Sequence, residues 1–248
     1  GDQTFLEDRF ARFSYRFKFR NGAYSTIAPY TQDCFIPKQY GYFLRGDESA
    51  TYQSTVVSFM ENLVNRILLQ IMTPEDESGN LVMVSELLDT MGISEIDIIY
   101  KEANNASLQV VETLTEETLV NYWLQATPNA TVVGVNTFAI LKETIPVKLD
   151  HQRALLRPGG NLQNITVPFE ATITNVVEDP LTPLVFTVTV DGGPWTFTAG
   201  DELIITQPVY EYDYQNNEPF KVLPSSQLTR VYDKVPVKAL TQEIISNR

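Results

Sequence analysis

"RFSYRFKFRNGAYSTIAPYT", residues 12–31, decides how the first part of the chain folds. Its aromatic side chains fall on every second position, as in a half-buried β-strand whose successive side chains point to opposite faces. Asn21-Gly22 then suits the positive backbone angles of a tight turn. The pattern predicts an antiparallel hairpin of residues 12–20 and 23–28, with its aromatic face in a core and its basic face toward solvent. The aromatic positions are Phe13, Tyr15, Phe17 and Phe19, and between them lie Arg12, Ser14, Arg16, Lys18 and Arg20.

Aromatic rings beside cations also occur in proteins that bind single-stranded nucleic acid, where bases stack on exposed rings. Here the alternation places rings and cations on opposite faces, which favours a structural strand. The formal charge of the chain is −13, which repels a phosphate backbone. Residues 75–117 alone carry a net −10, with Lys101 as their single cation. This acidic band would face solvent, a basic partner, or DNA that must slide past without sticking.

The length of 248 residues suits one large domain or two small ones, and the composition is that of a globular protein. Cys34 is the only cysteine, which excludes an internal disulfide and a thiolate metal cluster. No apolar run follows a positive N-terminal start, and no stretch of about 20 apolar residues occurs. We therefore expect neither a signal peptide nor a membrane span.

Short runs with strand alternation, separated by turn residues, predict a mainly β protein. EIDIIYKEANNASLQVV, residues 95–111, reads as a second hairpin with a turn at Asn104-Asn105. Residues 54–71 fit a short helical turn that runs into a strand from about Leu63. TLTEETLV carries a capping box, Thr113 with Glu116, and predicts a short helix.

The strands group into two predicted domains. About five strands in the first ~115 residues suggest a sandwich resembling fibronectin type III or immunoglobulin modules. Further β-rich runs indicate a second unit, a small β-barrel or compact sandwich. In the last stretch, aromatic residues again alternate with charged residues, as they do in the first. We therefore predict a fibronectin-like module of residues 1–119 and 208–248, with residues 120–207 inserted as a β-rich domain.

The search for chemistry returns no standard catalytic signature, so we predict no catalytic, cofactor-binding or metal-binding residue. His151, the single histidine, has no accompanying nucleophile motif, which favours a surface histidine. PEDESGN lacks the ligand alternation and terminal Glu of a calcium loop. Its acids, Glu75, Asp76 and Glu77, are the possible interaction surface. A glycosidase pair of carboxylates stays open, because it needs only spatial proximity.

Four segments occur in an order that resembles one class of proteins: residues 5–39, 59–71, 95–114 and 209–248. The most specific pieces are the aromatic strand before the NG turn, the YKE strand, and the ending RVYDKVPVKA…QEI…NR. The series resembles large virion structural proteins of tailed bacteriophages, including tail stabilisation or nozzle-type proteins of crAss-like and marine phages. The resemblance covers roughly residues 5–115 and 208–248, and residues from about 120 to 207 match nothing within it.

The resemblance implies a structural role in the tail or its junction with the capsid, and it transfers no catalytic residue. We expect a virion protein, assembled in an infected bacterium, that contacts copies of itself and other tail or neck proteins. We expect no enzymatic activity, no cofactor, no membrane and no tight nucleic-acid binding. Related proteins usually continue beyond the matched ending, so we expect a section of a longer polypeptide.

Two other classes remain open on the sequence. One is a carbohydrate-binding or host-receptor adhesion module, in which Trp123 and Trp195 would be the first suspects. The other is a glycosidase with two carboxylates facing each other in a cleft.

Overall fold

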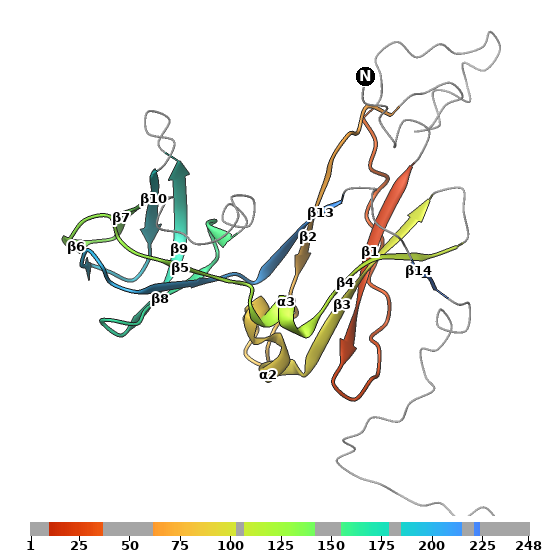
Figure 1. Cartoon of the computed structure of the whole chain (residues 1–248), viewed down its shortest axis with the longest axis horizontal. Helices are drawn as coiled ribbons and strands as arrows, with labels where there is room; N and C mark the ends of the chain where they lie inside the picture. The colour runs from red at the N-terminus through yellow and green to blue at the C-terminus, as the bar shows by residue number, and fades with distance from the viewer. Residues whose placement is uncertain are drawn as a thin grey trace, which may run out of the picture. The chain divides into compact units, whose positions relative to one another are not determined.

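The computed structural model describes six stretches of the chain, and its residues fall into two compact units (Figure 1). The described stretches are residues 10–36, 62–102, 107–141, 155–178, 185–214 and 221–223. Unit 1 comprises residues 1–67, 93–114 and 215–248, and unit 2 comprises residues 68–92 and 115–214.

The unit boundaries differ from those of the predicted domains. The prediction placed residues 68–92 in the first module, whereas they belong to unit 2, where β2 (Ile67–Met72) pairs with β13 (Val209–Tyr214). For the same reason the chain stays in unit 2 to Tyr214 and does not return to the first unit at residue 208. In both divisions the first unit is discontinuous in sequence.

Unit 1 is built on a four-stranded antiparallel sheet in the order β1-β3-β4-β14. Its strands are β1 (Ala11–Phe19), β3 (Ile93–Glu102), β4 (Gln109–Leu114) and β14 (Lys221–Val222). β3 and β4 are the two strands of the second predicted hairpin, and its turn at residues 104–105 lies outside the described residues. The register places Arg16 opposite Asp97, and Asp97 opposite Thr113.

The aromatic face of β1 is a core face at one end only. Phe13 is 1 % exposed and meets Tyr100 edge-on, with 5.6 Å between the ring centroids. Tyr15, Phe17 and Phe19 are half-buried, and the first two contact each other. The predicted burial of the aromatic row therefore applies fully to Phe13 alone.

The basic face of β1 is buried at its centre, so the prediction that it faces solvent was wrong for that part of the strand. Ser14 and Arg16 are each 5 % exposed. Ile99, which lies opposite Ser14 on β3, belongs to a buried hydrophobic cluster on this face. The cause is the chain after the NG turn, which folds over the face and packs Ile27 and Tyr30 against the cluster. The cluster consists of Ile99, Leu108, Val110 and Leu223.

Residues 23–34, which we call the edge segment, run antiparallel along β1 with a period of three residues. Every third N–H of the segment donates to every second carbonyl of β1, at 2.8–2.9 Å. These donor–acceptor pairs are Ser25 to Phe17, Ala28 to Tyr15, Thr31 to Phe13 and Cys34 to Ala11. The residue before each donor contacts the sheet face; these residues are Tyr24, Ile27, Tyr30 and Asp33. The third set, Thr26, Pro29 and Gln32, is exposed.

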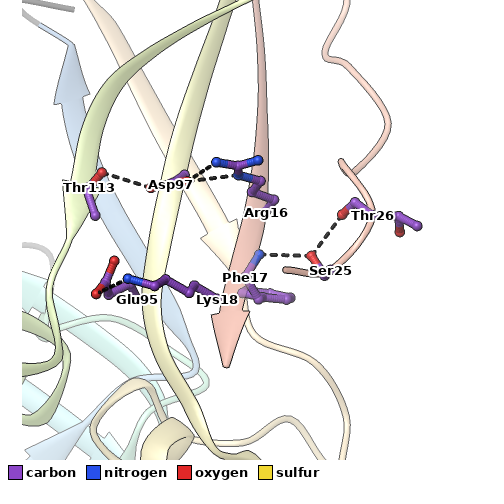
Figure 2. Close-up of polar contacts among 8 residues, drawn as sticks. All are labelled: Arg16, Phe17, Lys18, Ser25, Thr26, Glu95, Asp97 and Thr113. Carbon is purple, nitrogen blue, oxygen red and sulfur yellow. Dashed lines mark hydrogen bonds and ion pairs between the residues drawn. The ribbon is translucent and has the colours of Figure 1, made fainter. Parts of the chain in front are cut away.

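This period explains why residues 23–28 are not the regular strand that was predicted. A strand alternates with a period of two, whereas a three-residue period is that of a polyproline-type chain, for which Pro29 is suited. Two hydroxyl groups of the segment accept hydrogen bonds from β1. The Phe17 N–H donates to Ser25 Oγ at 2.9 Å (Figure 2), and the Phe13 N–H donates to Thr31 Oγ1 at 3.0 Å. The segment thereby covers the edge of β1, which would otherwise be open to pairing with another chain.

The described residues of unit 2 include three short helical elements between strands. They are η1 (Val84–Glu86), α2 (Leu87–Met91) and α3 (Glu116–Val120), and they pack against one another. The N-cap of α3 is Thr115, whose side chain accepts the Thr118 N–H. The predicted capping box was therefore placed two residues early, because Thr113 lies in β4. β2 likewise begins at Ile67 and not near Leu63.

The larger part of unit 2 is a six-stranded antiparallel sheet that curls into a half-barrel. The order is β5-β12-β8-β9-β10-β7. These strands are β5 (Trp123–Ala126), β7 (Thr137–Leu141), β8 (Asn161–Asn164), β9 (Phe169–Glu178), β10 (Val185–Val190) and β12 (Leu203–Thr206). The two edges meet just after β5, where Pro128 bridges Ile140 and the Asn129 N–H donates to the Ala139 carbonyl at 2.7 Å.

A two-stranded ribbon of β6 (Val132–Val135) and β11 (Trp195–Phe197) flanks the half-barrel. Phe197 of the ribbon stacks on Phe138 of β7, with 4.1 Å between the ring centroids. The inner face of the half-barrel is apolar and buried, as the alternation of β10 illustrates with Phe186, Val188 and Val190. The prediction of a mainly β protein is confirmed.

Candidate functional site

The three predicted interaction residues lie on a tight turn of unit 2. The Val82 N–H donates to the Pro74 carbonyl at 3.1 Å, and Glu75 forms a bridge with Leu81. Glu75 and Glu77 are exposed, so their carboxylates are free to meet a partner or solvent.

Asp76 has a different role, because its carboxylate shapes the turn. One oxygen accepts the N–H of Ser78 at 2.8 Å and the N–H of Asn80 at 2.9 Å. Hydrogen bonds from the backbone, that of Asn80 foremost, hold the pKa of Asp76 below its ordinary value. A test of the surface charge should therefore change Glu75 and Glu77 and leave Asp76 in place.

Four further exposed acids follow on η1, α2 and α3. With the two glutamates of the turn they make up what we call the acidic set: Glu75, Glu77, Glu86, Asp89, Glu116 and Glu117. No Lys or Arg occurs in residues 68–92 or 115–141. The other acids of the predicted band, Glu95, Asp97, Glu102 and Glu112, lie in unit 1. The predicted acidic band is therefore divided between the two units.

The net charge of the chain resides in unit 2. This unit holds 17 of the 31 Asp and Glu residues and 4 of the 18 Lys and Arg residues, which gives it a formal charge of −13. Unit 1 holds the remaining 14 acids and 14 cations and is formally neutral. The sequence pattern had shown only that residues 9–20 are basic and residues 75–117 acidic.

In unit 1 two acids of β3 are paired with two cations of β1. Arg16 and Asp97 form a buried ion pair at 2.8 Å, and the Thr113 hydroxyl donates to the other Asp97 oxygen at 2.8 Å (Figure 2). The ring of Tyr24 lies against the Arg16 guanidinium, with its centroid 4.0 Å from the carbon Cζ. This polar row crosses three strands inside the unit, which suits a structural role.

Two partly exposed ion pairs flank the buried row. Lys18 contacts Glu95 at 2.7 Å (Figure 2), and the hydrogen bond to Glu95 raises the pKa of Lys18. Arg12 contacts Asp33 of the edge segment, and its hydrogen bond lowers the pKa of that carboxyl. Three of the four cations in residues 12–20 are thus engaged in ion pairs within unit 1, so these residues do not present a row of free cations for phosphate binding.

The two tryptophans differ in their surroundings. Trp195 stacks on Phe169, with 4.4 Å between the centroids and an interplanar angle of 8°, and its indole N–H donates to the Asp191 carbonyl at 2.8 Å. Gly192 lies against its ring, because a Cβ there would be 3.4 Å from an indole carbon. Trp123, on edge strand β5, is 37 % exposed. Of the two suspected glycan contacts, only Trp123 presents a substantial free surface.

The described residues contain no group of three or more His, Cys, Asp or Glu side chains that could hold a metal ion. His151 lies outside the described stretches. No helix within these stretches is long and apolar enough to cross a bilayer. The arrangement that remains is an acidic, exposed set of carboxylates on a compact β scaffold, which can bind by charge.

Sequence reasoning placed residues 23–28 antiparallel to the aromatic strand, as their backbone hydrogen bonds show, but it missed the three-residue period of the edge segment and the buried pair. Tyr24, Ile27, Tyr30 and Asp33 recur at intervals of three, and they flank Pro29. Arg16 and Asp97 each lie between apolar residues in sequence. Their pairing, however, depends on the register of the two strands, which the sequence does not give. Comparisons with protein-family models, with curated proteins and with solved structures gave no match to the chain.

Proposed function

We propose that the chain is a structural component of a tailed-phage virion, in the tail or the neck assembly, and that it acts through protein–protein contacts. The observation that carries the proposal is the division of charge: one unit is formally neutral, with three cations of its aromatic strand in internal ion pairs, and the other has a charge of −13 and exposed carboxylates. The resemblance of residues 5–115 and 208–248 to virion proteins supports the same role. We further propose that unit 1 is a fibronectin- or immunoglobulin-like module, which its antiparallel sheet with two covered faces supports.

The direct test is the composition of the assembled particle. Mass spectrometry of purified virions should detect the chain in a fixed copy number, and a cryo-EM map of the particle should contain its β modules at repeated positions. Abundant chain in infected cells with none in purified particles would contradict the proposal.

The acidic set is the surface that we assign to docking. Reversing two charges in the Glu75→Lys/Glu77→Lys variant keeps Asp76 and its turn intact. Loss of particle incorporation with unchanged DNA behaviour supports docking on a basic protein. New DNA retention with normal incorporation supports a surface along which DNA slides. The control variant, Asn129→Lys/Thr196→Lys, adds positive charge elsewhere on unit 2, at two residues that are exposed.

Glycan binding is the second candidate, and the exposure of Trp123 favours it. A glycan array with the wild-type chain and the Trp123→Ala variant tests this directly. Wild-type binding that the variant loses would favour an adhesion module. The Trp195→Ala variant is a poor probe, because that ring stacks on Phe169 and supports the fold.

A further inference from the structure

The hairpin between β8 and β9 ends in a turn of four exposed residues, Ile165, Thr166, Val167 and Pro168, which we call the tip. Three of the four are apolar and none is charged. Ile165 is 49 % exposed and Val167 is 50 % exposed, so neither contributes a full side chain to the core. Single exposed apolar residues are common on protein surfaces. These two differ because a set of hydrogen bonds fixes the backbone that carries them.

Asn164 holds the tip from below. Asn164 is only 2 % exposed. Its Oδ1 accepts hydrogen bonds from the N–H groups of Thr166 and Val167, both at 3.0 Å. Its Nδ2 donates to Asp201 Oδ2 at 2.9 Å, and Asp201 is itself 3 % exposed. Burial of these polar groups is tolerated because each is hydrogen-bonded.

A second set of hydrogen bonds holds the tip from the side. The Ile165 N–H donates to the Glu202 carbonyl at 2.9 Å, and the Glu202 N–H donates to Thr166 Oγ1 at 2.9 Å. The tip is therefore ordered in the free protein. An ordered apolar projection avoids the entropy cost of immobilising a loop when it binds, which is a property of docking surfaces.

The charge around the tip limits the partner. Glu202 and Glu170 are exposed next to the hairpin. Among the described residues of unit 2, Arg157 is the single cation, and it is paired with Glu211. With a formal charge of −13, unit 2 repels a second unit 2, and the neutral unit 1 of another copy offers no opposite net charge.

We propose that the tip is the apolar anchor of a docking surface for a positively charged apolar surface of a different protein. Ile165 and Val167 supply the buried contact, and the surrounding carboxylates select Lys and Arg at its rim. The proposal extends the proposed assembly role, and it rests on that role for the location of the partner in a virion. The binding preference of the tip can be tested with the isolated chain.

The test uses the full chain and a fluorescent 14-residue amphipathic peptide of Leu and Lys, with a Leu/Glu peptide as its acidic counterpart. We expect anisotropy to show saturable binding of the Lys peptide, and methyl NMR to show its largest shifts at Ile165 and Val167. Ile165→Ser/Val167→Ser should weaken that binding by about tenfold, equivalent to about 1.4 kcal/mol. Val177→Ser should have little effect, because Val177 is equally exposed at 49 % but lies on β9 away from the tip. Asn164→Ala, which retains both apolar side chains but removes the brace, should weaken binding less.

Three outcomes would overturn the inference: no saturable binding, equal binding of the Glu peptide, or equal loss with Val177→Ser. Concentration-dependent shifts at the tip without peptide would make a second copy the occupant and would also overturn it. Failure here leaves the particle test unaffected, since the chain can still be found in virions. Absence from virions would contradict the proposed function while the binding chemistry of the tip stands.

Discussion

Arg16 and Asp97 are buried together, and each compensates the charge of the other. Removing one member of a buried pair leaves the other uncompensated and typically costs about 3–5 kcal/mol. We expect Asp97→Ala to lower the free energy of unfolding of unit 1 by about this amount. Urea unfolding, followed by hydrogen exchange of peptides from β1 and β3, measures the loss.

Glu95→Ala is the matched control on the same strand. Its pair with Lys18 has side chains 29 % and 30 % exposed, and a solvated pair of this kind contributes only about 0–1 kcal/mol. Equal losses from the two substitutions would show that the buried row is not what stabilises this face.

Asp76 gives a prediction about pH. Its pKa is lowered in the folded chain by backbone hydrogen bonds, so its stabilising effect is present above the ordinary carboxyl pKa and is lost as the pH falls through the lowered value. NMR titration should show the carboxyl of Asp76 protonating at a lower pH in the native chain than in urea. The amide shifts of Ser78 and Asn80 should move with the same midpoint. A native midpoint equal to the unfolded one would contradict the role of Asp76 in the turn.

At the level of single residues, the sequence predicted the strand but not its environment. Alternation identified the two faces of β1, because it reflects a local geometric period. It did not reveal that Arg16 is buried, because burial depends on the segment that covers the face. The exposure of Glu75 and Glu77 was within reach of the sequence, whereas the inward role of Asp76 required the geometry of the turn.

The edge segment makes its own prediction at the scale of an element. Ser25→Ala removes the acceptor of the Phe17 N–H, which should lower the free energy of unfolding by about 1 kcal/mol and reduce the exchange protection of that amide. Thr26→Ala is the control, because the Thr26 side chain is exposed and only its carbonyl takes part (Figure 2). Equal protection of Phe17 in both variants would contradict the role of the hydroxyl.

The sequence predicted those strands and hairpins whose pattern of alternation and turn residues lies within the element itself. The β3–β4 hairpin and the runs that became β9 and β10 carry alternation and turn residues of their own. The three-residue period of the edge segment is also local, but no strand or helix template detects it. The pairing of β2 with β13 joins residues far apart in sequence, and without register information the sequence could not assign residues 68–92 to the second unit.

At the scale of the molecule, the units differ most in charge. A net charge of −13 destabilises the folded state of unit 2 through self-repulsion. Salt screens this repulsion, because the Debye length falls from about 30 Å at 0.01 M to about 8 Å at 0.15 M ionic strength. Unit 1 is neutral, and screening should weaken its partly exposed pairs, Arg12–Asp33 and Lys18–Glu95. Salt should therefore act on the two units in opposite directions.

Raising NaCl from about 10 mM to about 150 mM should slow hydrogen exchange in the half-barrel and leave it unchanged or slightly faster in the sheet of unit 1. Peptides from β8 and β9 report on unit 2, and peptides from β3 and β4 report on unit 1. Sucrose is the control, because an excluded uncharged osmolyte stabilises both units alike. Neutralising part of the charge in Glu75→Gln/Glu77→Gln should reduce the response of unit 2 to salt. If salt slows exchange equally in both units, its effect is not screening of the charge in unit 2, and the division of charge has no consequence for stability.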